Sequence, residues 1–399
     1  DHVARLQEGP RVGVAGGAAG CGKPPADKLI PYLVAPQDIL PGVPYFYAST
    51  CRECPAGCGI VVRTREGRAI KVEGNPEHPV GQGGLCARGQ ASLQGLYDPD
   101  RIASPMIKTG GAWKKATWDE ALALVGEKLK AAGARVAVLT GNETGSLARL
   151  VGEWTAAAGG RHLTIEPFGY ESVRKANAIT FGRAEVPVWD VGAARCVFSF
   201  GADFLETFGR PVEQTRGFAA MRARRDDGAG FFVTIEPRLS ATGGNADEWV
   251  APRPGTEALV ALGMAHVILA EGLARAGQGL SALVAAYSPE AVSQQTDVPA
   301  ESIQRLARLF AKHEPSLAIA GGIASQGAQG TALVAAVNLL NWVAGNVGRT
   351  LRFDRTLNFD AVASHAQVRE FAAAMAQGAF DVAVVHGANP VYALPAGAG

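Results

Sequence analysis

The chain has 399 residues, of which 47% are hydrophobic and 19% charged, and its formal net charge is +1. This length exceeds the roughly 250 to 300 residues at which one hydrophobic core stops growing, so two or three domains are expected. The near-neutral charge excludes the strongly basic surface of a nucleic-acid-binding protein, and the apolar content excludes a disordered chain.

The first 43 residues predict a leader and a tether. Residues 12–21, VGVAGGAAGC, resemble the small-residue end of the signal peptide of an exported lipoprotein, with Cys21 as the lipid acceptor. A flexible Gly/Ala leader is the alternative, because the basic and strongly apolar parts of a signal peptide are missing from these residues. Residues 24–44 then predict an extended tether.

Residues 44–104 contain the strongest chemical signal, a C-x2-C-x3-C-x27-C motif. Two strand-like runs, 60–65 and 68–73, surround Glu66-Gly67 and predict a hairpin between the third and fourth cysteines. Three closely spaced thiolates and a fourth returned by a hairpin can bind the four corners of one [4Fe-4S] cluster. The predicted ligands are Cys51, Cys54, Cys58 and Cys86.

Two other uses of these cysteines stay open. Zinc would favour a second C-x2-C pair, which the motif lacks, and disulfides are possible in an exported protein. Gly57 and Gly84 support the cluster, because glycine lets backbone N–H groups approach sulfur closely. Arg88 would place a positive charge beside it. Cys196 lies within a strand-like run and is expected to be a small buried hydrophobe.

From residue 105 onward the pattern is that of an α/β protein. A capping box at Thr117-Trp-Asp-Glu120 predicts the start of a helix with Leu122, Val125 and Leu129 on one face. Short β-branched or aromatic runs then alternate with helical stretches, which predicts parallel sheets with crossover helices. The predicted strands are 135–140, 196–200, 231–235, 317–320 and 382–385, and the clearest helices are 256–273 and 302–312.

We therefore predict two α/β units behind the cysteine-rich domain. One is discontinuous, formed by residues 105–146 plus 316–399, and the other is inserted as residues 147–315. Open α/β sheets bind ligands at the carboxyl ends of their strands, so several strand ends should face one crevice. These ends are Gly141, Gly201, Pro237 and Gly387.

The ordered set of motifs resembles the molybdopterin oxidoreductase superfamily over about residues 45–395. The large subunits of that superfamily begin with a [4Fe-4S] loop of this spacing. The segments that carry the resemblance are 86–89, 200–203, 235–238, 246–247, 253–257, 338–348 and 387–390. The resemblance implies a small β-rich Fe-S domain followed by two doubly wound α/β units of the molybdopterin oxidoreductase type.

Within the superfamily, residues 50–58, 167–173 and 389–395 resemble the iron-sulfur subunit of bacterial alternative complex III, a quinol-oxidising membrane assembly. The resemblance implies an electron-transfer or scaffold subunit with no catalytic residue of its own. It also implies membrane and cytochrome c subunits as partners, and a place on the periplasmic face of the bacterial cytoplasmic membrane. No nucleic-acid partner is expected.

The superfamily's usual molybdenum ligand is missing from the expected place. Counting back from Phe181-Gly182 puts that ligand at or near Gly169, where the superfamily usually has Cys, selenocysteine, Ser or Asp. The resemblance therefore argues against a molybdopterin guanine dinucleotide cofactor. We then expect Phe168, Tyr170 and Glu171 to fill part of the crevice, because empty apolar volume is destabilising.

Two alternative functions remain. One is a truncated catalytic subunit of a bis-guanine-dinucleotide molybdenum oxidoreductase, and the other is a non-redox platform that binds other proteins. Metal content separates all three functions.

Overall fold

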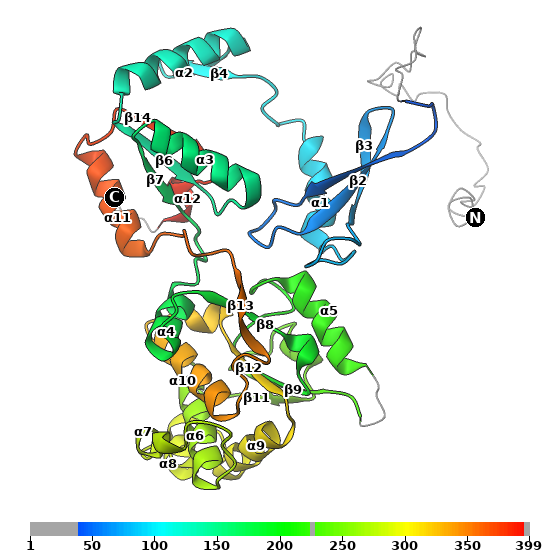
Figure 1. Ribbon diagram of the computed structural model, residues 1–399, viewed down its shortest axis with the longest axis vertical. Helices are drawn as coiled ribbons and strands as arrows, with labels where there is room; N and C mark the ends of the chain where they lie inside the picture. Colours follow the sequence, from blue (N-terminus) through cyan, green and yellow to red (C-terminus); the bar gives the residue numbers. More distant parts are fainter. Residues whose placement is uncertain (1–38, 224–227, 395–399) are drawn as a thin grey trace, which may run out of the picture.

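The computed structural model describes residues 39–223 and 228–394 (Figure 1). The predicted leader, including Cys21, lies outside the described residues. In Figure 1 two α/β units lie one above the other, called here the upper unit and the lower unit, with the cysteine-rich domain beside them. No helix in the described ranges is long and apolar enough to cross a membrane.

The cysteine-rich domain is a three-stranded antiparallel sheet covered by one helix. Its strands are β1 (Tyr45–Thr50), β2 (Gly59–Arg65) and β3 (Arg68–Gly74), and the helix is α1 (Ala87–Leu96). The predicted hairpin is confirmed: Glu66 and Gly67 have φ values of 49° and 78°, the left-handed turn conformation that joins β2 to β3. Strand β1 had not been predicted.

The upper unit is a three-stranded parallel sheet in the order β14-β6-β7. Alternate residues of the central strand β6 pack against different helices, so both faces of the sheet are buried. Its elements are α2 (Trp118–Ala132), β6 (Val136–Thr140), α3 (Gly145–Ala157), β7 (Arg161–Thr164), α11 (His365–Ala376) and β14 (Val382–His386). A small hairpin, β4 (Met106–Thr109) with β5 (Ala112–Lys115), precedes α2, and α12 (Pro390–Ala393) follows β14.

Helix α2 begins where the sequence predicts, since both bonds of the capping box at Thr117 and Glu120 are present. The predicted apolar face is only partly buried. Leu129 packs near the sheet, but Leu122 is 62% and Val125 50% exposed. The reason is that only the last turns of the helix reach the sheet.

The lower unit is a four-stranded parallel sheet in the order β11-β10-β9-β12, with a separate antiparallel pair β8-β13. Its strands are β8 (Val186–Trp189), β9 (Cys196–Phe200), β10 (Phe231–Ile235), β11 (Glu248–Val250), β12 (Ser316–Ala320) and β13 (Leu351–Leu357). Its helices are α4 (Glu171–Phe181), α5 (Pro211–Arg222), α6 (Glu257–Ala270), α7 (Ser281–Val284), α8 (Pro289–Thr296), α9 (Ala300–Lys312) and α10 (Gly330–Val343). These elements enclose the largest buried core of the chain.

Strand pairing corrects the predicted division into units 105–146 plus 316–399 and 147–315. Strand β7 pairs with β6 and so belongs to the upper unit, although residues 147–315 had been assigned to the inserted unit. Strand β12 pairs with β9 and so belongs to the lower unit, although it had been assigned to the discontinuous one. Strand and helix patterns look alike in both units, so periodicity cannot say which sheet a strand joins.

Candidate functional site

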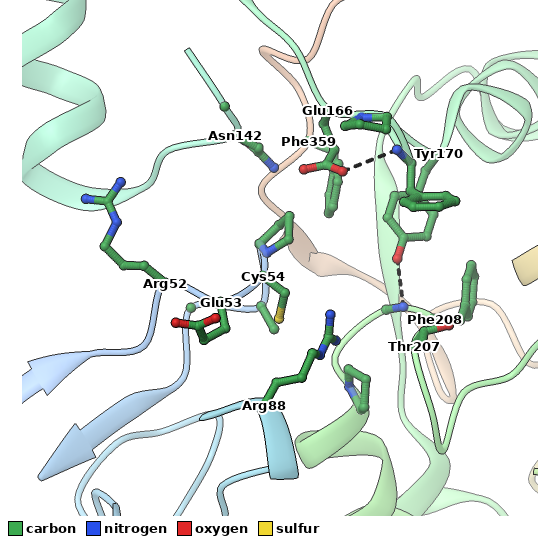
Figure 2. A pocket seen from close by; sticks show the side chains of 18 of the residues that line it. Arg52, Glu53, Cys54, Arg88, Asn142, Glu166, Tyr170, Thr207, Phe208 and Phe359 are labelled. Carbon is green, nitrogen blue, oxygen red and sulfur yellow. Dashed lines mark hydrogen bonds between the residues drawn. The ribbon is translucent and has the colours of Figure 1, made fainter. Parts of the chain in front are cut away.

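The strand ends of both units open onto one crevice, as predicted. Gly141 after β6, Gly201 after β9 and Gly387 after β14 all line a cavity of about 1200 Å³. Glu236 and Arg238, on either side of Pro237, line it after β10. The cysteine-rich domain forms another wall: Cys54 and Arg88 point into the cavity in Figure 2, and Arg52 also lines it. The site therefore joins the cysteine-rich domain to both α/β units.

The five cysteines in the described ranges are free of disulfides, which goes against the disulfide alternative. Cys51 and Cys58 are buried in one apolar cluster with Ile60 and Val72, and the Cys51 N–H donates to the Cys58 carbonyl at 2.8 Å. Cys86 is the residue before α1. Cys58 directly precedes β2, so the third and fourth cysteines lie at the starts of neighbouring elements of the domain.

The thiols influence one another electrostatically. Burial, followed by repulsion from Cys54, Cys51 and Cys86, raises the pKa of Cys58 to about 11. Burial also raises the pKa of Cys51, and Cys54 and Cys86 add to that increase. Iron binds the thiolate form, so the positive charge of a cluster would offset this repulsion.

No three His, Cys, Asp or Glu side chains in residues 39–223 and 228–394 are arranged to bind one metal ion. Zinc needs every thiolate at about 2.3 Å from a single point. A four-iron cluster binds each thiolate at a different corner, so its ligands lie farther apart. The spacing of the motif favours a cluster over zinc, and the assignment of the four ligands remains a prediction.

The structure gives the predicted supporting residues distinct surroundings. Gly57 lines the crevice with φ +60°, a conformation that favours glycine. Gly84 packs against the lower unit instead, because a Cβ there would lie 2.7 Å from Cγ1 of Val212. Arg88 is exposed, and its guanidinium points into the crevice (Figure 2). Their roles beside a cluster stay predictions.

Gly169 cannot present a ligand to the crevice as this backbone stands. A Cβ at this position would lie 2.9 Å from Cγ1 of Val362, so a side chain there would meet the wall of the protein. The residues of this segment that do line the crevice are Ile165, Glu166, Pro167, Phe168 and Tyr170. Glu166 was not singled out from the sequence, because a single carboxylate after a strand carries no distinctive pattern.

Phe168 and Tyr170 line the crevice, Glu171 does not, and about 1200 Å³ remains open beside them. Tyr170 forms part of the wall: its ring packs on Phe208 and Phe359, and its hydroxyl accepts the Gly209 N–H at 2.8 Å. Glu171 turns away to begin α4, where it pairs with Lys175 at 2.7 Å and with His365 at 2.8 Å. Packing into the walls leaves the centre of the crevice free.

Two carboxylates of this loop should affect stability with opposite signs. Burial raises the pKa of Glu166 above its usual value, although the Phe168 N–H opposes the shift. Burial also acts to raise the pKa of Glu171, but bonds from Lys175 and His365 outweigh it and hold the pKa at about 2. The ionised form is thus disfavoured by folding at Glu166 and favoured at Glu171.

We expect Glu166→Gln to raise the free energy of unfolding at pH 7 and Glu171→Gln to lower it. The increase in the free energy of unfolding from Glu166→Gln should vanish below about pH 4, where the Glu166 carboxyl is protonated in the unfolded chain as well. The decrease in the free energy of unfolding from Glu171→Gln should reach its full size above about pH 4.5 and become smaller toward pH 2. Urea unfolding at pH 7 and pH 3.5 measures both. The same sign of change for the two variants at pH 7 would contradict the assignment.

A four-cysteine loop beside an open crevice between two α/β units is the architecture of an iron-sulfur oxidoreductase. Family models identify it further: residues 45–98 match the molybdopterin oxidoreductase Fe4S4 domain, and residues 101–394 match the molybdopterin oxidoreductase domain. The chain belongs to the molybdopterin oxidoreductase family. The Fe4S4 domain supports a [4Fe-4S] cluster.

The chain is similar in sequence to subunits of known oxidoreductases. The molybdopterin-binding-like subunit of menaquinone reductase from Nitratidesulfovibrio vulgaris is 33% identical over 374 residues, 89% of this chain and 54% of that protein. The molybdopterin-containing subunit of thiosulfate reductase from Salmonella typhimurium is 30% identical over 294 residues, 69% of this chain and 37% of that protein. The chain thus spans about half the length, or less, of these relatives.

Acetylene hydratase from Pelobacter acetylenicus has a similar fold, with a TM-score of 0.61 at 20% sequence identity. The match covers 77% of this chain and 44% of that structure. It supports the fold class, a small Fe-S domain followed by α/β units of the molybdopterin oxidoreductase type.

Proposed function

We propose that this chain transfers electrons in, or scaffolds, a membrane-associated quinol-oxidising respiratory complex similar to alternative complex III. The observation that supports a quinone-linked complex is the 33% identity, over 89% of the chain, to a subunit of menaquinone reductase. The resemblance of residues 50–58, 167–173 and 389–395 to alternative complex III favours quinol oxidation. A [4Fe-4S] cluster bound by Cys51, Cys54, Cys58 and Cys86 would carry one electron at a time. The partners would be a quinol-oxidising membrane subunit and cytochrome c subunits.

The proposal places the chain on the periplasmic face of the bacterial cytoplasmic membrane. It would be attached through its partners and through a lipid on Cys21, because residues 12–21 resemble a lipoprotein processing site. The partner subunits would add to this attachment. Mass spectrometry of the N-terminal peptide tests this part, and an unmodified Cys21 would remove it.

The proposal also holds that the crevice contains no molybdenum. No usual molybdenum ligand lies at residues 168–171, and Gly169 faces Val362. We expect about four iron atoms per chain and molybdenum well below one when the protein is purified with its partner subunits. Plasma mass spectrometry of the metals measures both elements. Molybdenum near one atom per chain would overturn this part, and the absence of iron would leave the non-redox platform.

A catalytic subunit with molybdopterin guanine dinucleotide is the second candidate. The open crevice favours it, because about 1200 Å³ would accommodate a large ligand. Arg88 and Arg238 also line the crevice, and neither has an ion-pair or hydrogen-bond partner among the described residues. Both could bind phosphate groups of such a cofactor. The cofactor would supply two-electron oxidation and reduction, and the same metal analysis distinguishes the two candidates.

A further inference from the structure

The start of helix α5 is in direct contact with the cysteine-rich domain, although it belongs to the lower unit. Val212 packs against the apolar cluster that contains Cys51 and Cys58. The contact is close, since a Cβ on Gly84 would lie 2.7 Å from Cγ1 of Val212. Pro211, the first residue of α5, also lines the crevice. This end of α5 thus lies beside the predicted cluster ligands.

Arg210, the residue before α5, is held in a defined orientation by the lower unit. Its backbone N–H donates to Oε1 of Gln214 at 3.0 Å. Its guanidinium donates to the Thr356 carbonyl at 3.4 Å and to the Glu213 carboxylate at 3.5 Å. Only 19% of the Arg210 side chain is exposed. Its charge is therefore less screened by water and salt than that of the exposed Arg88.

The charges around Arg210 sum to a net positive value. Glu213 also pairs with Arg355 at 3.6 Å, so two arginines and one carboxylate give +1. The N-terminus of α5 adds a partial positive charge of the same sign. Arg210 lies two residues before Val212, whose side chain packs on the apolar cluster of Cys51 and Cys58, so this positive charge lies close to the predicted ligands.

We propose that Arg210 raises the reduction potential of the cluster that Cys58 helps to bind. The inference rests on the proposed function, because it requires the cluster. Reduction adds one electron to the oxidised cluster, from a quinol-derived donor in the complex or from dithionite in the test, and no bond forms or breaks. A nearby positive charge stabilises the more negative reduced cluster. Arg210 acts through space and does not bind iron.

The test is an EPR-monitored redox titration of the full-length protein with its cluster. We expect Arg210→Gln to lower the midpoint potential and Arg210→Lys, which keeps the charge, to restore most of it. Glu213→Gln should raise the potential, because it removes the neighbouring negative charge. Arg216→Gln is the control: Arg216 lies on the same helix and bonds to Gln82 at 3.3 Å, but it is exposed. It should shift the potential much less.

The outcomes separate this inference from the proposed function. If the wild-type protein contains no iron and gives no EPR signal of a reduced cluster, the proposed function is contradicted. A wild-type cluster whose potential does not fall in Arg210→Gln would overturn the inference alone. If Arg210→Gln fails to fold or to bind iron, the midpoint potential of Glu213→Gln tests the inference instead. An unchanged or lower potential in Glu213→Gln would then reject the role of this charge group.

Discussion

Replacing Cys58 by Ala is expected to remove the cluster, reducing bound iron from about four atoms per chain to near background. Cys58 is 5% exposed and lies in the same apolar cluster as Cys51, so water cannot readily take the place of its thiolate. Three remaining ligands would leave one iron corner open in a buried place. Iron analysis and visible absorption of the purified protein measure the loss.

Cys196→Ala is the matched control. Cys196 is fully buried in strand β9, and burial raises the pKa of its thiol, so it behaves as a small hydrophobe. Its removal should leave the iron content unchanged and cost about 1 kcal/mol of stability. A Cys58→Ala protein with wild-type iron, or a Cys196→Ala protein without iron, would show that the cysteines have been assigned to the wrong roles.

Replacing Asn341 by Ala should cause a large loss of stability, about 3 kcal/mol or more. Asn341 on α10 is 1% exposed and mimics a neighbouring strand at the edge of the lower sheet. Its Oδ1 accepts the Ala318 N–H at 2.9 Å, and its Nδ2 donates to the Ala318 carbonyl at 2.8 Å. Without it, both backbone groups of Ala318 stay buried and unpaired, which is costly in an apolar core.

Urea unfolding of the full-length variant measures this effect. Asn245→Ala is the control, because Asn245 also bonds to a carbonyl, that of Ala241 at 2.9 Å, but it is exposed. It should change the free energy of unfolding by less than about 1 kcal/mol. If the two variants lose the same small amount, the edge of β12 does not depend on the Asn341 side chain.

Several parts of this protein could be predicted from local sequence, because their causes are local. The hairpin at Glu66-Gly67 needs only a turn pair between two β-prone runs, and the start of α2 needs only the capping box at Thr117. The cysteine motif has a spacing that few other uses share, and the Fe4S4 family match agrees with it. The crevice could also be predicted, since glycine turns after parallel strands lie at one edge of each sheet.

Local sequence patterns are enough to predict the class of elements, the order of the cysteine motif and the α/β units along the chain, and the family. The sheets that β7 and β12 join could not be predicted in this way, because strand pairing depends on contacts between distant segments. Packing between distant segments also makes Gly169 face Val362, keeps the crevice open, and brings Val212 of the lower unit against the cluster of Cys51 and Cys58. Side-chain direction and long-range electrostatics arise from packing, which no local pattern of residues encodes.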